Sequence, residues 1–381
     1  MTLATDQQYE VSAWKGDHRS ELLRRPWESL ASSRETSTAV YQSPLYFDFL
    51  HDGNPDDLFV VLTVKDRRTD AIAGIVPVKL WTYRLRFTFR ARTFFEIGRS
   101  SVGILGSEPM IPDDPRAFDE LFAAFARQYP ESQVIYMDAV PPTSYLWRHL
   151  QTSATIRSLY YTLVMDGFRE WHYLLLPKSM DEYYKRLTRK KRYNLMRQER
   201  RLQAHGGYAL RLVIINKEED IHHLSAAMES CLPKKKHDFF FRKEEYIRLS
   251  RFGLLHCYIL HSGEDIVGLL LGTKAGKIFR ISRLFHNPSM KKFSPGTTLW
   301  QLVLKDLISG GEFSRVDFGY GLPAYRHSST NVVEQRGRVL LFRRTAANRC
   351  LVLAYSFYST LVRFVADKVK RISRQSVAPG G

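Results

Sequence analysis

Apolar and polar positions in the first half of the chain alternate in blocks that predict a fixed order of elements. The apolar runs at 58–64 and 71–80 flank the polar turn KDRRTD and predict an antiparallel hairpin. RFTFRARTFFEIG then has strand composition, and AFDELFAAFARQYPESQVIYMD predicts a helix followed by a strand that ends at Asp138. The predicted order is hairpin, strand, helix and strand.

The second half repeats this order. LLHCYIL, the turn HSGE and DIVGLLLGTK predict a second hairpin, and KIFRISRLF predicts the next strand. TTLWQLVLKDLISGGEFSRVD predicts a helix and a strand that ends at Asp317, and Gly74 and Gly268 hold matching places in the two hairpins. Because the whole order recurs over about a hundred residues, it favours a duplicated unit over a chance likeness of generic hairpins.

We therefore expect an α+β fold with two tandem domains, each a mixed, mostly antiparallel sheet flanked by helices. A length of 381 residues also exceeds what one core usually supports. The predicted segments are an N-terminal extension at 1–25, a first domain at 26–166, a second at 167–335, and a C-terminal strand with an amphipathic helix and basic tail at 336–381.

Charge and cysteine content limit the function classes. The formal net charge of +18 favours anionic partners such as phosphates, nucleic acid or the inner leaflet of a membrane. Cys231, Cys257 and Cys350 form no CxxC, which argues against a disulfide framework and a zinc site and suits a reducing cytosol. The acidic N-terminus does not resemble a signal peptide, and no apolar run is long enough to span a bilayer. We expect a cytoplasmic protein with no metal.

Two segments have an open interpretation. A basic helix is predicted at 180–202, stopped by Gly206 and Gly207, and seven of the residues 185–197 are Lys or Arg. It is either a solvated face or an anion-facing surface. The stretch 350–366 is apolar, with Arg363 as its one charge, and cations follow it. It is either a docked amphipathic helix or a helix at a membrane interface, which would be a peripheral contact at the inner face.

The segment MKKFSPGTTL has the features of a phosphate-binding helix start. Ser294 suits an N-cap and Pro295 suits the first helical position. Gly296 lets a ligand approach the backbone, and the N–H groups of 296–298 are predicted to lack intrahelical partners and to point at an anion. The two lysines at 291–292 add charge. A simple cap would explain only the serine and the proline.

The segment VDFGYGLPAYRHSS predicts a strand that ends in a glycine-rich loop. It matches G-x-G-x-x-A, but Pro323 and the lack of a later acidic residue argue against a dinucleotide site. The loop carries Asp317, Tyr320 and Tyr325, and loops at strand ends commonly hold functional groups. Aromatic packing under a turn is the alternative for each tyrosine.

These motifs follow one another in the order of a known family. From about 175 to 330, the basic helix ending in HGG, then DIVGLLLG, RISRLFHNPSM, SPGTTL and DFGYGLPAYR, resembles the BioF2-like or FemAB-like branch of the GCN5-related N-acetyltransferase (GNAT) superfamily. Asp317, Gly319, Gly321 and Tyr325 match its D-x-G-x-G-x-x-x-Y-K motif, and Arg326 replaces the lysine. The first half resembles the more divergent companion domain, so the resemblance implies tandem GNAT-like domains.

The resemblance implies an acyl thioester held between two splaying strands, with its diphosphate on the next helix. It assigns the coenzyme A diphosphate to Lys292, Ser294, Gly296, Thr297 and Thr298. The corresponding segment of the first half, EPMIPDDPR, is acidic and would repel a diphosphate, which predicts one donor site per chain.

The resemblance also implies direct attack of an amine on the thioester, with no covalent enzyme intermediate. Tyr325 is the candidate acid for the leaving thiolate, and Tyr320 is the second choice. Asp317 is the candidate base or amine-orienting group, with an alternative role in holding the glycine-rich loop through backbone N–H groups.

The function expected from the resemblance is N-acyl transfer from acetyl-CoA, or another acyl-CoA, to a small-molecule or glycan amine such as an amino sugar in envelope or exopolysaccharide synthesis. Two alternatives stay open. An aminoacyl-tRNA-dependent transferase is favoured by the charge and the basic helix, although no coiled-coil insertion is visible. A non-catalytic accessory protein of polysaccharide synthesis is the other.

Overall fold

The structure is a computed structural model that describes residues 8–33, 38–54, 58–89, 92–233, 242–321 and 331–375. The described residues form two compact units. Unit 1 lies within Met1–Phe47, Asn54–Arg169 and Gln335–Gly381, and unit 2 within Asp48–Gly53 and Glu170–Glu334. The strand and helix after residue 335 thus group by contact with the first half. The expected boundaries of independently folding domains, at 167 and 335, stay a prediction.

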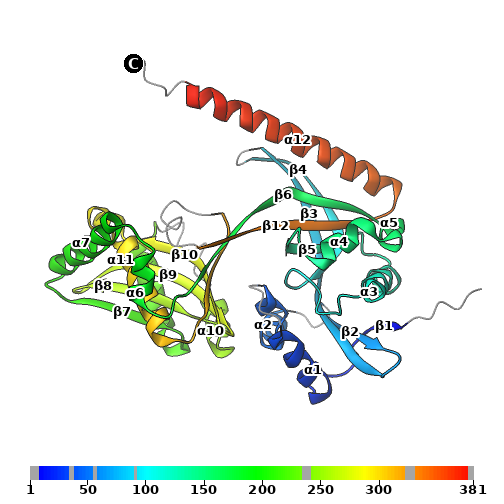
Figure 1. Cartoon of the computed structure of the whole chain (residues 1–381), viewed down its shortest axis with the longest axis horizontal. Helices are drawn as coiled ribbons and strands as arrows, with labels where there is room; N and C mark the ends of the chain where they lie inside the picture. Colours follow the sequence, from blue (N-terminus) through cyan, green and yellow to red (C-terminus); the bar gives the residue numbers. More distant parts are fainter. Residues whose placement is uncertain are drawn as a thin grey trace, which may run out of the picture. The chain divides into compact units, whose positions relative to one another are not determined.

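Unit 1 is built on a sheet with the strand order β1-β2-β3-β4-β5-β12-β6 (Figure 1). Its strands are β1 (Tyr9–Ala13), β2 (Phe59–Asp66), β3 (Ala71–Phe89), β4 (Arg92–Ile104), β5 (Val134–Val140), β12 (Val332–Arg343) and β6 (Tyr160–Leu175). Residues 9–13, expected in an extension, form β1 and pair antiparallel with β2, because Tyr9 and Val11 bury their side chains in the core.

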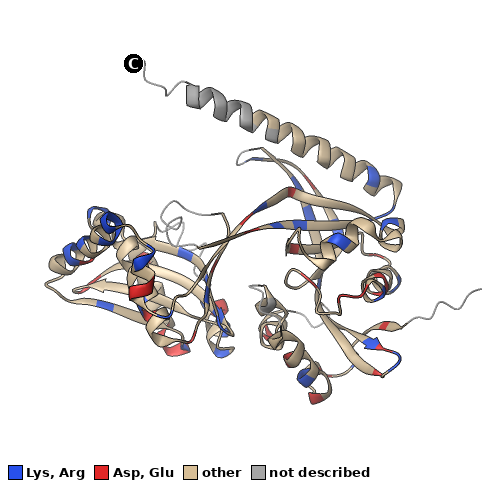
Figure 2. Ribbon diagram, viewed as in Figure 1, with Lys and Arg blue, Asp and Glu red and all other residues tan. Residues whose placement is uncertain are grey.

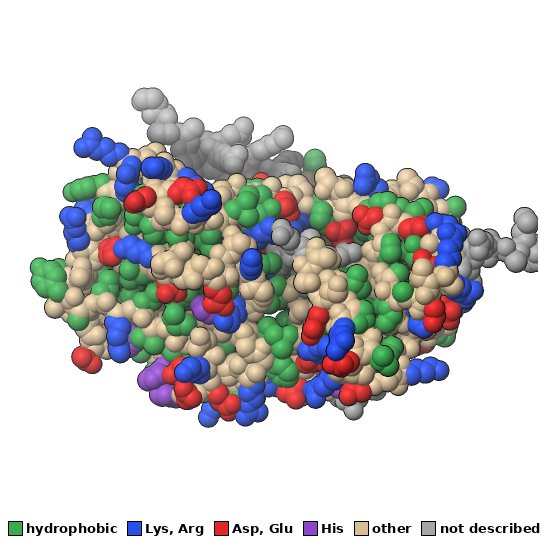
Figure 3. Space-filling view, turned by 60° about the horizontal axis from the view of Figure 1, so that its bottom comes forward, with side chains coloured by type: hydrophobic (Ala, Val, Ile, Leu, Met, Phe, Trp, Pro, Cys, Tyr) green, Lys and Arg blue, Asp and Glu red, His purple; other side chains and the backbone are tan. Residues whose placement is uncertain are grey.

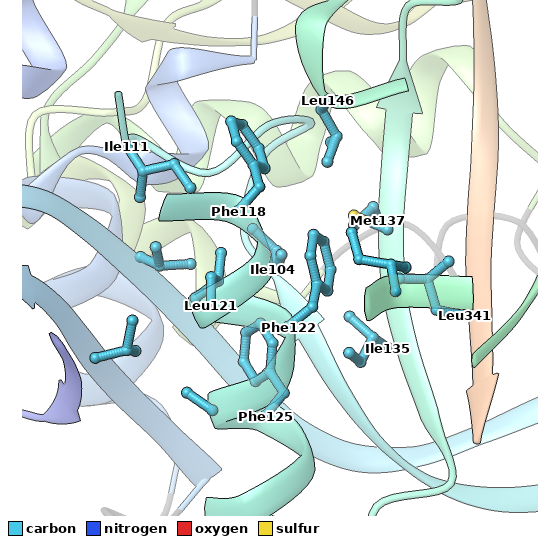
Figure 4. Packing of buried hydrophobic residues seen from close by; sticks show 14 of the residues in the cluster. Ile104, Ile111, Phe118, Leu121, Phe122, Phe125, Ile135, Met137, Leu146 and Leu341 are labelled. Atoms are coloured by element: carbon cyan, nitrogen blue, oxygen red, sulfur yellow. The ribbon is translucent and has the colours of Figure 1, made fainter. Parts of the chain in front are cut away.

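The helices of unit 1 cover this sheet. They are α1 (Glu21–Ser32), η1 (Ala39–Gln42), the start of α2 (Pro44–Asp52), α3 (Pro115–Gln128), α4 (Tyr145–Thr152), α5 (Ala154–Leu159) and α12 (Ala346–Gln375). Figure 4 shows the packing of α3: Phe118, Leu121, Phe122 and Phe125 lie against Ile135 and other apolar side chains of the sheet. Their spacing is the 3.6-residue period that the sequence predicts for this helix.

Unit 2 has the strand order β6-β11-β10-β9-β8-β7, so that β6 runs from one unit into the other. Its further strands are β7 (Leu210–Ile215), β8 (Cys257–Ser262), β9 (Asp265–Ala275), β10 (Ile278–His286) and β11 (Arg315–Tyr320). Its helices are α6 (Met180–Lys185), α7 (Arg189–His205), η3 (Glu218–Asp220), α8 (Ile221–Cys231), α10 (Lys243–Arg251), η4 (Pro288–Phe293) and α11 (Pro295–Gly310).

The predicted repetition is present in the element order. Each unit has an antiparallel hairpin (β2–β3 or β8–β9), a third strand (β4 or β10), a helix (α3 or α11), and a strand that pairs parallel to the third (β5 or β11). Gly74 pairs with Val64 and Gly268 pairs with Leu260, and a bulge follows each of these partners. The expected α+β class with a mixed, mostly antiparallel sheet in each half is confirmed.

The basic helix differs from its prediction. The sequence predicts one helix at 180–202, but the structure has α6 and α7 with a break at 186–188. The break has a local cause, because the Thr188 side chain caps α7 by accepting the N–H of Lys191 at 3.3 Å. The end of the helix agrees with the prediction, since Gly206 is the C-cap of α7.

A buried polar chain lies in the core of unit 2. The Tyr258 hydroxyl donates to Asp306 Oδ2 at 2.8 Å and lies 2.8 Å from His256 Nε2. His256 is only 4% exposed and has the rings of Phe279 and Phe313 beside it. Burial, with a smaller contribution from Lys274, lowers the pKa of His256 to about 4.

This lowered pKa predicts a loss of stability in acid. Between about pH 6.5 and pH 4 the unfolded chain binds a proton at this position that the folded chain does not, so the free energy of unfolding falls as the pH falls through this window. The contribution of His256 is at most about 3 kcal/mol. Urea unfolding at pH 7, 6, 5 and 4 should show a shallower pH dependence for His256→Gln. The exposed His222→Gln should behave like the wild type, and equal slopes for all three proteins would contradict the assignment.

Candidate active site

The site begins where two parallel strands of unit 2 stop pairing. β10 and β11 are in register only from Ile278↔Arg315 to Arg280↔Asp317. β10 continues to His286 in antiparallel register with β9, and β11 continues to Tyr320 in register with β6. Within the ranges described, the ladder between β10 and β11 therefore ends after Arg280 and Asp317, while each strand stays paired with its other neighbour.

The start of α11 lies beside the end of β10. A Cβ atom placed on Gly296 would lie 3.2 Å from Leu284 Cδ2 and 3.6 Å from His286 Nδ1. The predicted helix start is confirmed: Ser294 is the N-cap residue and Pro295 is the first helical residue. Ser294 has φ 55° and ψ 47°, the left-handed conformation, and its side chain makes no capping hydrogen bond. Non-glycine residues with positive φ are uncommon, and this chain also has them at Asp70, Ala139, Asp166 and Tyr208.

The main-chain amides at this helix start correct one expectation. Thr297 and Thr298 donate their N–H groups to the Ser294 carbonyl at 3.1 Å and 3.3 Å. Two of the three amides that the sequence assigned to an anion are thus engaged inside the helix, because the carbonyl of an N-cap residue accepts the first intrahelical hydrogen bond. The Thr298 side chain is fully buried, which also separates it from any ligand at the surface. Gly296 is the residue of the three whose amide is best placed for an anion.

Cations lie directly before this helix start. Lys291 and Lys292 are exposed residues of η4, and Lys292 Nζ lies 5.0 Å from the centroid of the Phe293 ring. The Phe293 ring in turn stacks on His205 at 4.5 Å, at the end of α7. The aromatic contact orients Lys292 without neutralising it, since a ring face attracts a cation but carries no net charge.

The equivalent helix start in unit 1 is built differently. The Asp114 side chain caps α3 by accepting the N–H of Arg116, and the two side chains also form an ion pair at 2.9 Å. Hydrogen bonds from Arg116 hold the pKa of Asp114 below its usual value, with burial acting in the opposite direction. A resident carboxylate thus occupies the place where an anionic ligand would bind.

Asp317 is fully buried on β11, next to the last paired residue of β10. Its Oδ1 accepts the N–H of Gly319 at 2.7 Å, across a bulge at Phe318, and Gly319 has φ 70°. This hydrogen bond stabilises the turn at Gly319, which agrees with the alternative role predicted for Asp317, that of holding the glycine-rich segment through backbone N–H groups. Burial lowers the pKa of the neighbouring Arg280, and the Asp317 carboxylate partly offsets this effect.

Of the two tyrosines predicted as candidate acids, Tyr320 lies among the described residues. It ends β11, is half-buried, and packs edge-to-face on Trp171 with 4.8 Å between ring centroids. Tyr325 and Arg326, the end of the predicted motif, lie outside the described residues. Arg280 and His286 are residues of this region that the sequence interpretation did not select. Arg280 lies over Trp171 at 5.6 Å, and its position opposite Asp317 follows from strand register, which no sequence motif encodes.

A second feature of unit 2 is a groove along α7, a hollow of about 370 Å³. We call it the α7 groove. Among its lining residues are Tyr193, Met196, Arg197, Arg200, Arg201 and Tyr208. Tyr193 and Tyr208 are 62% and 75% exposed, and cationic positions recur along the α7 ribbon in Figure 2. On the face drawn in Figure 3, by contrast, cationic side chains are interspersed with acidic ones. The α7 groove combines aromatic faces with guanidinium groups.

The described part of the chain has no cluster of metal ligands, and two of its cysteines are buried. No three His, Cys, Asp or Glu side chains gather there as metal ligands would. Cys231 and Cys257 are buried, and burial raises the pKa of each thiol to about 12. Among the helices in these ranges, none has both the length and the hydropathy needed to cross a bilayer.

Comparison with known proteins identifies the fold of this site. Residues 189–327 match the model of an acetyltransferase (GNAT) domain. No curated protein matches the chain in sequence. The crystal structure of FemX is similar with a TM-score of 0.57 and 9% identity, covering 83% of this chain and 95% of FemX.

Two other solved structures are less similar. A tandem GNAT protein from the clavulanic acid biosynthesis pathway has a TM-score of 0.48 at 9% identity, covering 88% of this chain and 98% of its own. L-PGS from Bacillus licheniformis has a TM-score of 0.47 at 14% identity, covering 86% of this chain and 95% of its own. At such identities, likeness to a solved structure concerns the fold alone. Residues 189–327 thus form a GNAT domain, and the chain has a FemAB-like fold of the GNAT superfamily.

Proposed function

We propose that the protein is an N-acyltransferase that moves an acetyl or similar acyl group from an acyl-CoA thioester to an amine. The observation that carries the proposal is the early end of the β10–β11 pairing, beside the start of α11, where Gly296 lies close to Leu284 and His286 at the end of β10. An extended thioester could enter between the two strands where their mutual pairing ends. Its diphosphate would then meet the first turn of α11.

The diphosphate site is proposed from three groups. The Gly296 amide and the Ser294 hydroxyl would donate to phosphate oxygens, and Lys292 would supply a positive charge. The roles of Thr297 and Thr298 at the diphosphate stay a proposal; their N–H groups bond to the Ser294 carbonyl, and these bonds would support the turn that presents the donors. The Asp114 cap of α3 supports one donor site per chain, in unit 2.

The chemistry requires an amine, a proton acceptor and a proton donor. The amine nitrogen attacks the thioester carbonyl, and collapse of the tetrahedral intermediate breaks the carbon–sulfur bond and releases the thiolate. The ammonium proton passes to a base, and the thiolate takes a proton from an acid. We propose Tyr325 as the acid, with Tyr320 as the second choice. Asp317 is proposed as a positioning residue, since it already accepts the Gly319 amide.

The acceptor is proposed by analogy alone to be an amino sugar or another envelope precursor amine. We place the reaction in the cytoplasm, where acyl-CoA is available and where thiols stay reduced.

Substitution of Gly296 tests the donor site. Gly296→Glu places a carboxylate at the proposed diphosphate position, so acetyl-CoA binding should weaken at least about a hundredfold, or about 2.7 kcal/mol. Gly310→Glu controls for the added charge, since a Cβ at the other end of the same helix would meet open space, and Gly296→Ala controls for the Cβ, which would lie 3.2 Å from Leu284 Cδ2. Calorimetric titration of the three variants and the wild type measures the effect. Absence of acetyl-CoA binding by the wild type would end the proposal.

Asp317→Asn separates a positioning role from a catalytic one. The amide oxygen can still accept the Gly319 N–H, but the negative charge next to the partly buried Arg280 is lost. We expect a loss of about 2 kcal/mol in the free energy of unfolding by urea titration. A variant with wild-type stability, a greatly reduced kcat and an altered pH profile would instead identify Asp317 as the base.

The α7 groove favours a second candidate function, aminoacyl transfer from a charged tRNA. Arginines next to exposed tyrosines are suited to a phosphodiester backbone with unstacked bases. Under this candidate, Arg200→Glu should weaken tRNA binding about tenfold or more and reduce its salt dependence. Lys217→Glu, an equal charge change at an exposed position away from the groove, should have a small effect. Equal loss in both variants would indicate nonspecific attraction, and filter binding at several salt concentrations measures it.

A further inference from the structure

The C-terminal helix α12 is apolar on two sides. On one side it packs on unit 1: Leu351 and Tyr355 are buried together with Leu85 and Phe342. The ring of Phe87 also contacts Tyr355, at 5.4 Å between centroids. This side accounts for the docked amphipathic helix that the sequence predicts.

The other side of α12 presents large apolar residues to solvent. Leu353, Phe357, Leu361 and Phe364 are 61%, 74%, 50% and 66% exposed. Their spacing of four, four and three residues places them along one line of an α-helix. Single exposed apolar residues are ordinary on a protein surface, but a row of four over three turns marks a binding surface. We call this row the α12 stripe.

The charge of α12 indicates what covers the stripe. Between Ala346 and Gln375 the sequence contains Arg349, Arg363, Lys368, Lys370, Arg371 and Arg374 against the one acid Asp367, a net charge of +5. A second copy of the helix would bring like charges together, which opposes self-association through this row. An anionic lipid surface matches both properties, since acyl chains accept the apolar row and lipid headgroups attract the cations.

We propose that the α12 stripe binds the interface of an anionic lipid bilayer. Leu353, Phe357, Leu361 and Phe364 enter the boundary between headgroups and acyl chains, and the helix lies parallel to the membrane. Because the opposite side of α12 is packed on the core of unit 1, the helix stays attached to the protein while its exposed side binds lipid. The contact is peripheral and weakens with salt, since part of the attraction is between charges near the surface.

Vesicle flotation of the full chain tests the proposal. Vesicles of phosphatidylcholine alone are compared with vesicles that contain one quarter phosphatidylglycerol, at low and high salt. We expect the wild type to float with the anionic vesicles and to be released by salt. Phe357→Ser with Phe364→Ser should reduce the bound fraction at least tenfold. Leu22→Ser with Leu45→Ser, which removes two exposed apolar residues of α1 and α2, should bind like the wild type.

Three results would overturn the proposal. One is a wild type that does not bind anionic vesicles, and another is equal binding by the Phe357/Phe364 variant. The third is a dimer of the wild type in light scattering that the Phe357/Phe364 variant does not form, together with no flotation, which would assign the stripe to a second copy. Thermal unfolding of both double variants checks that they fold, as expected for changes at exposed positions.

Discussion

The early end of the parallel ladder between β10 and β11 is the constraint on which the candidate site depends. Their mutual pairing ends at Arg280 and Asp317, whereas β10 stays paired with β9 to His286 and β11 stays paired with β6 to Tyr320. The bulge at Phe318 and the hydrogen bond from Gly319 to Asp317 redirect β11 just after the last pair. Strands whose mutual pairing ends in this way can take an extended ligand between them by strand addition.

The two units show how the same element order supports different chemistry. In each, a helix follows the third strand and leads to a parallel fourth strand. In unit 1 the helix start is satisfied by the Asp114 carboxylate, whereas in unit 2 the left-handed Ser294 leaves its side chain out of the cap. A helix start attracts an anion only when its own side chains do not supply one. The contrast supports the proposal that the donor site lies in unit 2.

The two units also differ in their surface features. The α7 groove in unit 2 places arginines beside exposed tyrosines, and the α12 stripe in unit 1 places exposed apolar residues on a helix with a net charge of +5. The proposed lipid contact and the proposed acyl transfer are independent, since no residue takes part in both. An enzyme bound at a lipid surface would be near acceptors that are themselves attached to lipid.

The repeated order of hairpin, strand, helix and strand and the start of α11 at Pro295 could be predicted from the chain, because periodicity and capping residues act over a few neighbouring positions. The sequence likewise determined the excess of positive charge. Only the tertiary structure decided that Asp317 lies opposite Arg280 and that the row from Leu353 to Phe364 faces solvent. Strand register and helix orientation follow from contacts between distant segments, which local patterns do not contain.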